Sequence, residues 1–214
     1  NKSLRNGKMV YCCSDSTVST VGSKSAEGKM SPRNMLTTTI GDELKIATDF
    51  KAKVIGVSLK DRAAILPAGH AADGAYWIDY STGTFISSTY YMKELPKWAV
   101  DYNKSIGKVT KDQICYTPLG NKITEEMAKA AVAGEQLGGD NVTDLLAVSF
   151  SCTDMIGHKY GTHSDKTREI YVDLDKRLAD LFGYLDQNVG KDQYLVFLMA
   201  DHGAANSILL SREH

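Results

Sequence analysis

Hydrophobic residues in this chain gather in short unbroken runs and in longer stretches with helical spacing. Three runs are rich in β-branched or bulky apolar residues, and they cover residues 53–59, 144–150 and 193–199. Their apolar residues occupy consecutive positions, a pattern typical of strands that are covered on both faces, as in a parallel sheet. We therefore expect these runs to be three buried strands of one sheet.

Helical patterns lie between these runs. Residues 42–50 form a short one, and residues 124–137 open with Thr124, a common capping residue, followed by two glutamates. Residues 164–189 carry the clearest apolar stripe, which Gly190 ends. The order strand, long helix, strand predicts a βαβ crossover. The expected fold class is α/β, with a mostly parallel central sheet flanked by helices.

The stretch from residue 66 to residue 118 has a different pattern, because it is rich in aromatic residues and turn signals. We expect an irregular, cap-like insertion within one domain that spans residues 1–214, with a hairpin across residues 74–91. Tyr76, Trp77 and Phe85 could form either a small local core or a substrate wall, and a local core is the preferred interpretation.

The length and charge of the chain argue against binding to nucleic acid and against a place in a membrane. The chain has 214 residues, with 25 Lys and Arg against 26 Asp and Glu, so its net charge is −1. A basic excess that would drive binding to nucleic acid or to anionic membranes is absent. The apolar runs are too short to span a bilayer. The first residues are polar and contain no signal peptide, and the chain is expected to be an internal segment of a longer precursor.

The four cysteines are Cys12, Cys13, Cys115 and Cys152. Their spacing fits neither a zinc ribbon nor a disulfide scaffold. A single bridge from Cys115 to Cys12 or Cys13 stays open in an oxidising compartment. Four structural thiols are the preferred interpretation.

Candidate chemistry follows two of the predicted strands as pairs of aspartate and histidine. Asp154 and His158 are four residues apart, so they share one face of a helical turn, and both are zinc-ligand types. Asp201 and His202 directly follow the run 193–199, where a buried carboxylate needs a partner such as a metal. On spacing alone, the first pair is more often a helix cap beside an unrelated surface histidine; the same interpretation is open for the second pair but fits it less well.

The third strand end carries Lys60, Asp61 and Arg62. The lysine and the arginine could hold a dianionic group, although such residues are more often a solvated ion-pair cluster. Ligands of parallel sheets bind beyond the carboxyl ends of the strands, where all three groups are expected. Together they indicate metal-assisted chemistry on an anionic substrate, most simply a phosphate ester.

These residues resemble a known family. The pattern S-x-T-D-x-x-G-H at residues 151–158, followed by A-D-H-G at residues 200–203, is similar to the alkaline phosphatase superfamily, in the branch of type I phosphodiesterases and nucleotide pyrophosphatases. The strings STVSTVGSKSAEGKMSPRN, KVIGVSLKDRAAILPAGH, FISSTYYMKELPKW and DQYLVFLMADHG resemble the phosphate-irrepressible alkaline phosphatases of Bacteroidetes-type bacteria.

The resemblance implies a centre of two zinc ions in the complete enzyme. Asp154 and His158 match ligands of the first zinc, and Asp201 and His202 match ligands of the second. Lys60 and Arg62 match the pair that binds the non-bridging oxygens of a phosphate monoester. Phosphodiesterase relatives lack this S-L-K-D-R element, so the resemblance favours monoesters.

The resemblance also implies parts that we do not find between Asn1 and His214. A threonine nucleophile, a metal-binding aspartate and a phosphoryl-binding asparagine are expected upstream, and a last histidine ligand is expected downstream. His214 itself is not assigned as that ligand. Ser58 and Thr153 lie near the strand ends, but neither has a visible base, so neither is favoured as a nucleophile. This segment alone is expected to be incomplete and inactive.

The function expected from these observations is hydrolysis of phosphate monoesters. The alternatives are a phosphodiesterase or nucleotide pyrophosphatase with the same metal centre, and a non-catalytic fragment with a vestigial site. The expected partner is a small-molecule phosphate ester, with no nucleic acid and no membrane span. A monomer or weak dimer is expected, and the family implies a periplasmic or secreted location.

Overall fold

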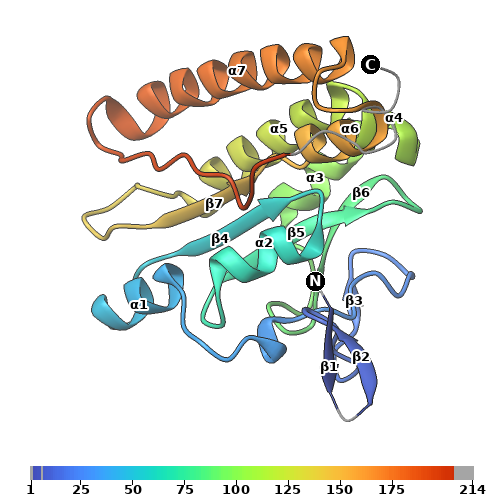
Figure 1. Cartoon of the computed structure of the whole chain (residues 1–214). Coiled ribbons are helices and arrows are strands. Elements are labelled where there is room, and N and C mark those ends of the chain that lie inside the picture. Colours follow the sequence, from blue (N-terminus) through green and yellow to red (C-terminus); the bar gives the residue numbers. More distant parts are fainter. Residues whose placement is uncertain (1, 6, 205–214) are drawn as a thin grey trace.

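The computed structural model describes residues 2–5 and 7–204, and its centre is a five-stranded sheet with the strand order β3-β6-β5-β4-β7 (Figure 1). Two of the four pairings are parallel, because β4 pairs in parallel with both β5 and β7, while β6 runs antiparallel to β5 and β3. The expected α/β fold is confirmed, but the sheet is mixed and not mostly parallel as expected. The strands are β1 Lys2–Arg5, β2 Lys8–Tyr11, β3 Thr20–Val21, β4 Val54–Ser58, β5 Gly74–Asp79, β6 Thr84–Ser88 and β7 Leu145–Ser149.

Helices cover both faces of this sheet, with α2 below it and α3, α5 and α7 above it in the view of Figure 1. Strands β1 and β2 form a separate antiparallel hairpin. The α-helices are α1 Ile40–Ala47, α2 Asp61–Ala68, α3 Lys97–Ile106, α4 Lys111–Tyr116, α5 Leu119–Glu135, α6 Cys152–Tyr160 and α7 Asp165–Leu185. A 3₁₀ turn covers Pro32–Asn34, and a π turn covers Asp186–Gly190.

The side-chain alternation of β5 divides the core into two layers. Tyr76 and Ile78 belong to the layer that contains Ile123 and Met127 of α5. Trp77 belongs to the layer on the α2 side. Successive strand residues point to opposite faces, so one strand supplies both layers. Tyr76, Trp77 and Phe85 are buried, so they are core residues as preferred, but they belong to the two layers of the central core and not to a small local one.

Strand β4 lies very close to α2 because Gly56 has no side chain. A Cβ atom at Gly56 would lie 2.0 Å from the carbonyl oxygen of Ala64 in α2. Real Cβ atoms do not approach a backbone oxygen so closely, so only glycine allows this packing. The close contact fixes α2, and with it the residues at the start of that helix, against the end of β4.

Helix α5 begins earlier than its sequence pattern suggested. It starts at Leu119, directly after Pro118, so Thr124 lies inside the helix and is not its cap. The Thr124 hydroxyl is buried and donates to the carbonyl oxygen of Gly120 at 2.8 Å. The predicted cap was wrong because proline, which suits a helix start, supplied a stronger signal six residues upstream.

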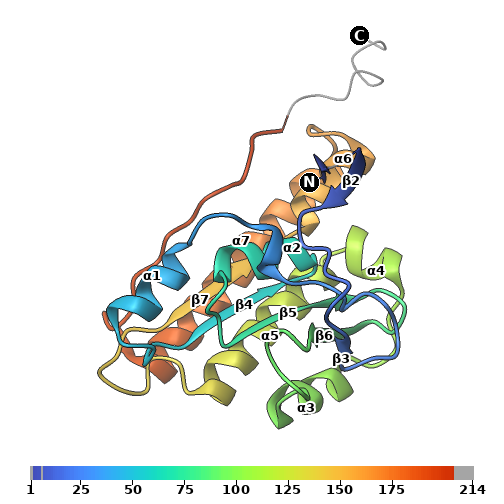
Figure 2. The same cartoon turned by 90° about the horizontal axis from the view of Figure 1, so that it is seen from below.

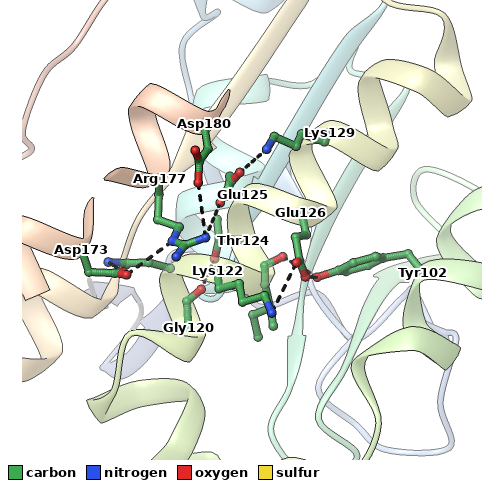
Figure 3. Close-up of polar contacts among 12 residues, drawn as sticks. Tyr102, Gly120, Lys122, Thr124, Glu125, Glu126, Lys129, Asp173, Arg177 and Asp180 are labelled. Atoms are coloured by element: carbon green, nitrogen blue, oxygen red, sulfur yellow. Dashed lines mark hydrogen bonds and ion pairs between the residues drawn. The ribbon is translucent and has the colours of Figure 1, made fainter. Parts of the chain in front are cut away.

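Helix α7 follows its prediction closely. Ser164 caps it by accepting a hydrogen bond from the amide of Thr167, and the helix continues to Leu185. It is tied to α5 through Glu125, a buried residue whose carboxylate binds Lys129 and Arg177 (Figure 3). The two long helices are therefore joined by charge as well as by apolar contacts.

The run 193–199 is not a strand in this structure, which corrects the sequence prediction. Its large side chains are exposed, and Leu195, Phe197, Leu198 and Met199 each keep more than 70% of their accessible surface. Figure 2 shows the segment as an extended chain along the outside of the molecule. A strand needs a hydrogen-bonded neighbour and cover for its apolar faces. This run lacks both within the described residues, so the βαβ crossover does not close.

The hairpin predicted across residues 74–91 is present as β5 and β6, and it belongs to the central sheet. The cap-like role expected for residues 66–118 stays a prediction. All four cysteines have free thiols. In the described part of the chain, no helix is long and apolar enough to cross a membrane.

Candidate functional site

The carboxyl ends of β4 and β7 meet through buried serines. The Ser58 hydroxyl donates to the carbonyl oxygen of Ser149 at 3.0 Å and lies 3.2 Å from the Ser151 hydroxyl. The Lys60 amide donates to the Ser58 oxygen at 3.2 Å. Parallel pairing brings the two strand ends to the same edge of the sheet. The serines thereby fix the residues that follow each strand.

Lys60 and Asp154 form an ion pair at this edge of the sheet. The Lys60 ammonium donates to Asp154 Oδ2 at 2.5 Å, and both side chains are mostly buried. Burial raises the pKa of the Asp154 carboxyl, but the hydrogen bond and charge of Lys60 outweigh it and hold that pKa below its usual range. The carboxylate is therefore ionised at neutral pH.

Both candidate histidines face the same carboxylate. His158 Nε2 lies 3.1 Å from Asp154 Oδ1, one helical turn along α6, and His202 Nε2 lies 3.8 Å from the same oxygen. The hydrogen bond to the Gly203 carbonyl and the charge of Asp201 raise the pKa of His202. Asp201 lies at the outside of the cluster and is almost fully exposed, with its Oδ2 atom 3.8 Å from His202 Nε2.

The donor atoms of this cluster fit zinc in their chemistry but do not complete a site. Zinc binds aspartate oxygen and histidine nitrogen, and catalytic zinc takes three protein ligands. Among the described residues, no group of three or more His, Cys, Asp or Glu side chains is arranged to hold a metal ion. Lys60 and His158 already contact the two oxygens of Asp154. These residues could supply ligands once Lys60 moved aside.

A cavity of about 260 Å³ opens beside the cluster, at the carboxyl ends of β4 and β5. Six residues of its wall matter most here: Lys60, Arg62, Tyr80, Lys111, Tyr116 and Met155. Lys60 and Arg62, which the sequence suggested as an anion-binding pair, both line this cavity. A guanidinium and an ammonium group in one cavity can hold an anion from two directions.

Tyr11 supports Arg62 from the N-terminal segment. The Tyr11 hydroxyl donates to Asp61 Oδ1 at 2.7 Å, fifty residues away in the sequence. Burial lowers the pKa of Arg62, but the contacts with Tyr11 and Asp61 outweigh this effect and raise the pKa overall, so the guanidinium stays charged. Sequence reasoning missed Tyr11, Lys111, Tyr116 and Lys159. None of them lies in a motif, and only the folded chain brings them to this edge.

Comparisons with known proteins identify the family of this chain. Residues 31–208 match the model of the family "Type I phosphodiesterase / nucleotide pyrophosphatase". The chain is 43% identical to alkaline phosphatase PafA of Elizabethkingia meningoseptica, with 97% of this chain and 47% of PafA aligned. It is also 43% identical to alkaline phosphatase PhoV of Synechococcus elongatus, with 94% of this chain and 45% of PhoV aligned.

Solved structures of PafA match the fold. The wild-type crystal structure aligns with a TM-score of 0.93 and 44% identity, covering 97% of this chain and 50% of PafA. A PafA mutant with a threonine, an asparagine, a lysine and an arginine replaced matches equally well, with a TM-score of 0.93 and 43% identity. The chain spans about half the length of these relatives. It belongs to the type I phosphodiesterase and nucleotide pyrophosphatase family.

Proposed function

We propose that the full-length protein hydrolyses phosphate monoesters by phosphoryl transfer. The observation that carries this proposal is the position of Lys60, which contacts Asp154 on one side and lines the cavity with Arg62 on the other. A substrate in that cavity would lie beside the aspartate and histidine cluster. The names of PafA and PhoV as alkaline phosphatases support the same reaction class.

Lys60 and Arg62 would bind the non-bridging oxygens of the phosphoryl group. Negative charge on these oxygens must be stabilised during phosphoryl transfer, and fixed cations in a partly dry cavity do this well. The PafA mutant supports this role, because its replaced lysine and arginine are two positions apart, as Lys60 and Arg62 are. A monoester dianion carries more charge than a diester, so two cations favour the monoester.

Two zinc ions would be held by ligand sets that include Asp154 with His158 and Asp201 with His202. When bound, such ions lower the pKa of a nucleophile and stabilise the leaving oxygen. The donor chemistry of the cluster supports the assignment. Within the described residues we assign no nucleophile, and the family resemblance points to a threonine. The same resemblance supports a periplasmic or secreted location.

The test compares a monoester and a diester that share one leaving group, using purified full-length protein. We expect kcat/KM for 4-nitrophenyl phosphate to exceed that for methyl 4-nitrophenyl phosphate. Faster hydrolysis of the diester would favour the alternative, a phosphodiesterase with the same metal centre. Absence of hydrolysis together with absence of bound zinc would favour a non-catalytic module.

A further inference from the structure

Two further lysines, Lys111 and Lys159, lie in or against the wall of the cavity beside Lys60, and neither belongs to the pair assigned to the phosphoryl group. Lys111 of α4 places its ammonium 5.4 Å from the ring centroid of Tyr80. Lys159 of α6 places its ammonium 3.7 Å from the ring centroid of Tyr116. Tyr80, Lys111 and Tyr116 line the cavity. Lys111 therefore lines the cavity itself, and Lys159, which comes from another helix, contacts a tyrosine of its wall.

Aromatic rings hold these two ammonium groups without neutralising them. A tyrosine face attracts a cation through its ring electrons and carries no net charge. Neither lysine forms an ion pair with a carboxylate within the described residues, whereas Lys60 is paired with Asp154. The buried Cys115 thiol in the cavity wall feels the charges of Lys111 and Lys60 and, with the opposite sign, that of Asp112. Asp112 offsets only part of the charge of Lys111 and Lys159, so this part of the cavity keeps an excess of positive charge.

The cavity lining also contains two acidic residues, Asp61 and Glu27. Asp61 accepts a hydrogen bond from the Tyr11 hydroxyl, and the backbone carbonyl of Glu27 accepts one from the indole of Trp77. Asp61 directly precedes Arg62 in the sequence. Within the described residues, neither Asp61 nor Glu27 forms an ion pair with Lys111 or Lys159, so these two lysines stay available to an anion.

We propose that Lys111 and Lys159 form a second anion subsite, so that the preferred substrates are phosphate monoesters whose leaving group carries a carboxylate. This proposal rests on the proposed function, because it assigns the phosphoryl group to Lys60 and Arg62. A volume of about 260 Å³ suits a small phosphorylated acid and not a large ligand. Tyr80 and Tyr116 would pack against the carbon skeleton between the two anionic groups.

The first experiment measures kcat/KM of the full-length protein for phenyl phosphate and 4-carboxyphenyl phosphate. Each variant is compared with wild type on the same substrate, so differences in leaving-group reactivity cancel. For the carboxylated substrate, we expect Lys111→Gln to lower kcat/KM about threefold and the Lys111→Gln, Lys159→Gln double variant to lower it about tenfold, typical of partly exposed ion pairs. The value for phenyl phosphate should stay within a factor of two.

Lys108→Gln serves as the matched control, because Lys108 is an exposed lysine three residues before Lys111 and does not line the cavity. It should leave both substrates unchanged. Equal effects of Lys111→Gln on the two substrates would overturn the subsite, because the lysine would then not distinguish the carboxylate.

A binding experiment separates the subsite from the reaction. Isothermal titration calorimetry compares phenylphosphonate with 4-carboxyphenylphosphonate, neither of which can be hydrolysed. We expect the carboxylated compound to bind wild type about tenfold more tightly, and the double variant to bind both compounds equally. Such a preference without any hydrolysis would keep the subsite and reject the proposed function. Equal binding by wild type would overturn the subsite even in an active phosphatase.

Discussion

Lys60 and Asp154 are 94 residues apart in the sequence, and they meet at 2.5 Å where β4 and β7 end. The parallel pairing of the two strands places them there, with Ser58 opposite Ser149 in the register. A carboxylate with two histidine neighbours and a cation that reaches into a cavity are thereby joined at one point. The pairing of these strands is what links the candidate metal cluster to the candidate phosphoryl pocket.

The first prediction concerns selectivity. Replacing Lys60 and Arg62 together with alanine in the full-length protein should lower monoester hydrolysis by about 10²-fold or more, equivalent to about 3 kcal/mol of transition-state stabilisation. Diester hydrolysis should fall much less, because a diester has one charge fewer to be held. Initial rates on the two substrates with a shared leaving group measure the difference.

Lys166 and Arg168 offer a matched control, because they have the same spacing and lie exposed on α7. Their double alanine variant should retain both activities. Equal losses of the two activities in the Lys60 and Arg62 variant would remove the reason for assigning monoester preference to these residues.

The second prediction concerns the metal. Full-length protein treated with a chelator should lose activity and regain it with zinc, while Asp154→Asn and His202→Ala should each retain less zinc after gel filtration. Fewer ligands bind zinc more weakly, because each lost donor removes a metal bond. Elemental analysis measures the zinc content of each variant per mole of chain. His163→Ala, an exposed histidine outside the cluster, should keep the full amount. Wild-type zinc content in Asp154→Asn would contradict its assignment as a ligand.

Most helices and strands of the fold could be predicted from the sequence, because short local patterns of apolar residues indicate them. Consecutive apolar positions predicted β4 and β7, and an apolar stripe that Gly190 ends predicted α7. The run 193–199 carries the same local signal and still forms no strand. A strand depends on a neighbour that the run itself does not encode, so its apolar pattern could not decide the outcome.

The candidate site was readable only in part. Asp154, His158 and Lys60 lie in motifs directly after strands, so the rule on strand ends located them. Lys111 and Lys159 carry no such signal, because a lysine on a short helix is ordinarily a solvated surface residue. Lys111 lines the cavity and Lys159 contacts its wall through Tyr116 because of how α4 and α6 pack together, which no local pattern shows.

The third prediction tests the close packing of β4 on α2. Gly56→Ala should destabilise the protein by about 1–3 kcal/mol, because the added methyl group meets the Ala64 carbonyl oxygen and forces the helix away. Gly183→Ala is the control, since a Cβ atom there meets nothing within 4 Å, and alanine should stabilise α7 by about 0.5–1 kcal/mol. Urea unfolding measures both. A Gly56→Ala protein as stable as wild type would show that α2 can shift freely.

The fourth prediction concerns pH and Asp15. Burial raises the pKa of this carboxyl, but hydrogen bonds from Ser31, Thr17 and Arg33 outweigh it and lower the pKa from 3.8 to about 2. A depressed pKa in the folded state means that the carboxylate stabilises the fold above its unfolded pKa. That contribution should be lost as the pH falls from about 4 through about 2.

Asp15→Asn should therefore cost about 2 kcal/mol at pH 7, typical of hydrogen bonds to a charged group. The difference from wild type should shrink as the pH approaches 2. Urea unfolding at a series of pH values measures this convergence. A difference that stayed constant over the whole range would show that Asp15 does not stabilise the fold through its charge.

The fifth prediction concerns the ionic network between α5 and α7. Glu125 is only 2% exposed, and Arg177 Nη1 lies 3.2 Å from Glu125 Oε2, while Lys129 binds the other carboxylate oxygen (Figure 3). Replacing Arg177 by methionine leaves a buried carboxylate with one cation fewer. Because a buried charge that loses a partner keeps its desolvation penalty, we expect a cost of about 2 kcal/mol or more.

Arg168→Met on the same helix should cost little, since its ion pair with Asp165 is exposed to solvent. Combining Arg177→Met with Glu125→Gln should then restore part of the lost stability, because the second change removes the unpaired charge. Urea unfolding of the single and double variants gives the coupling, and strictly additive losses would mean that Arg177 stabilises the helix pair by packing alone.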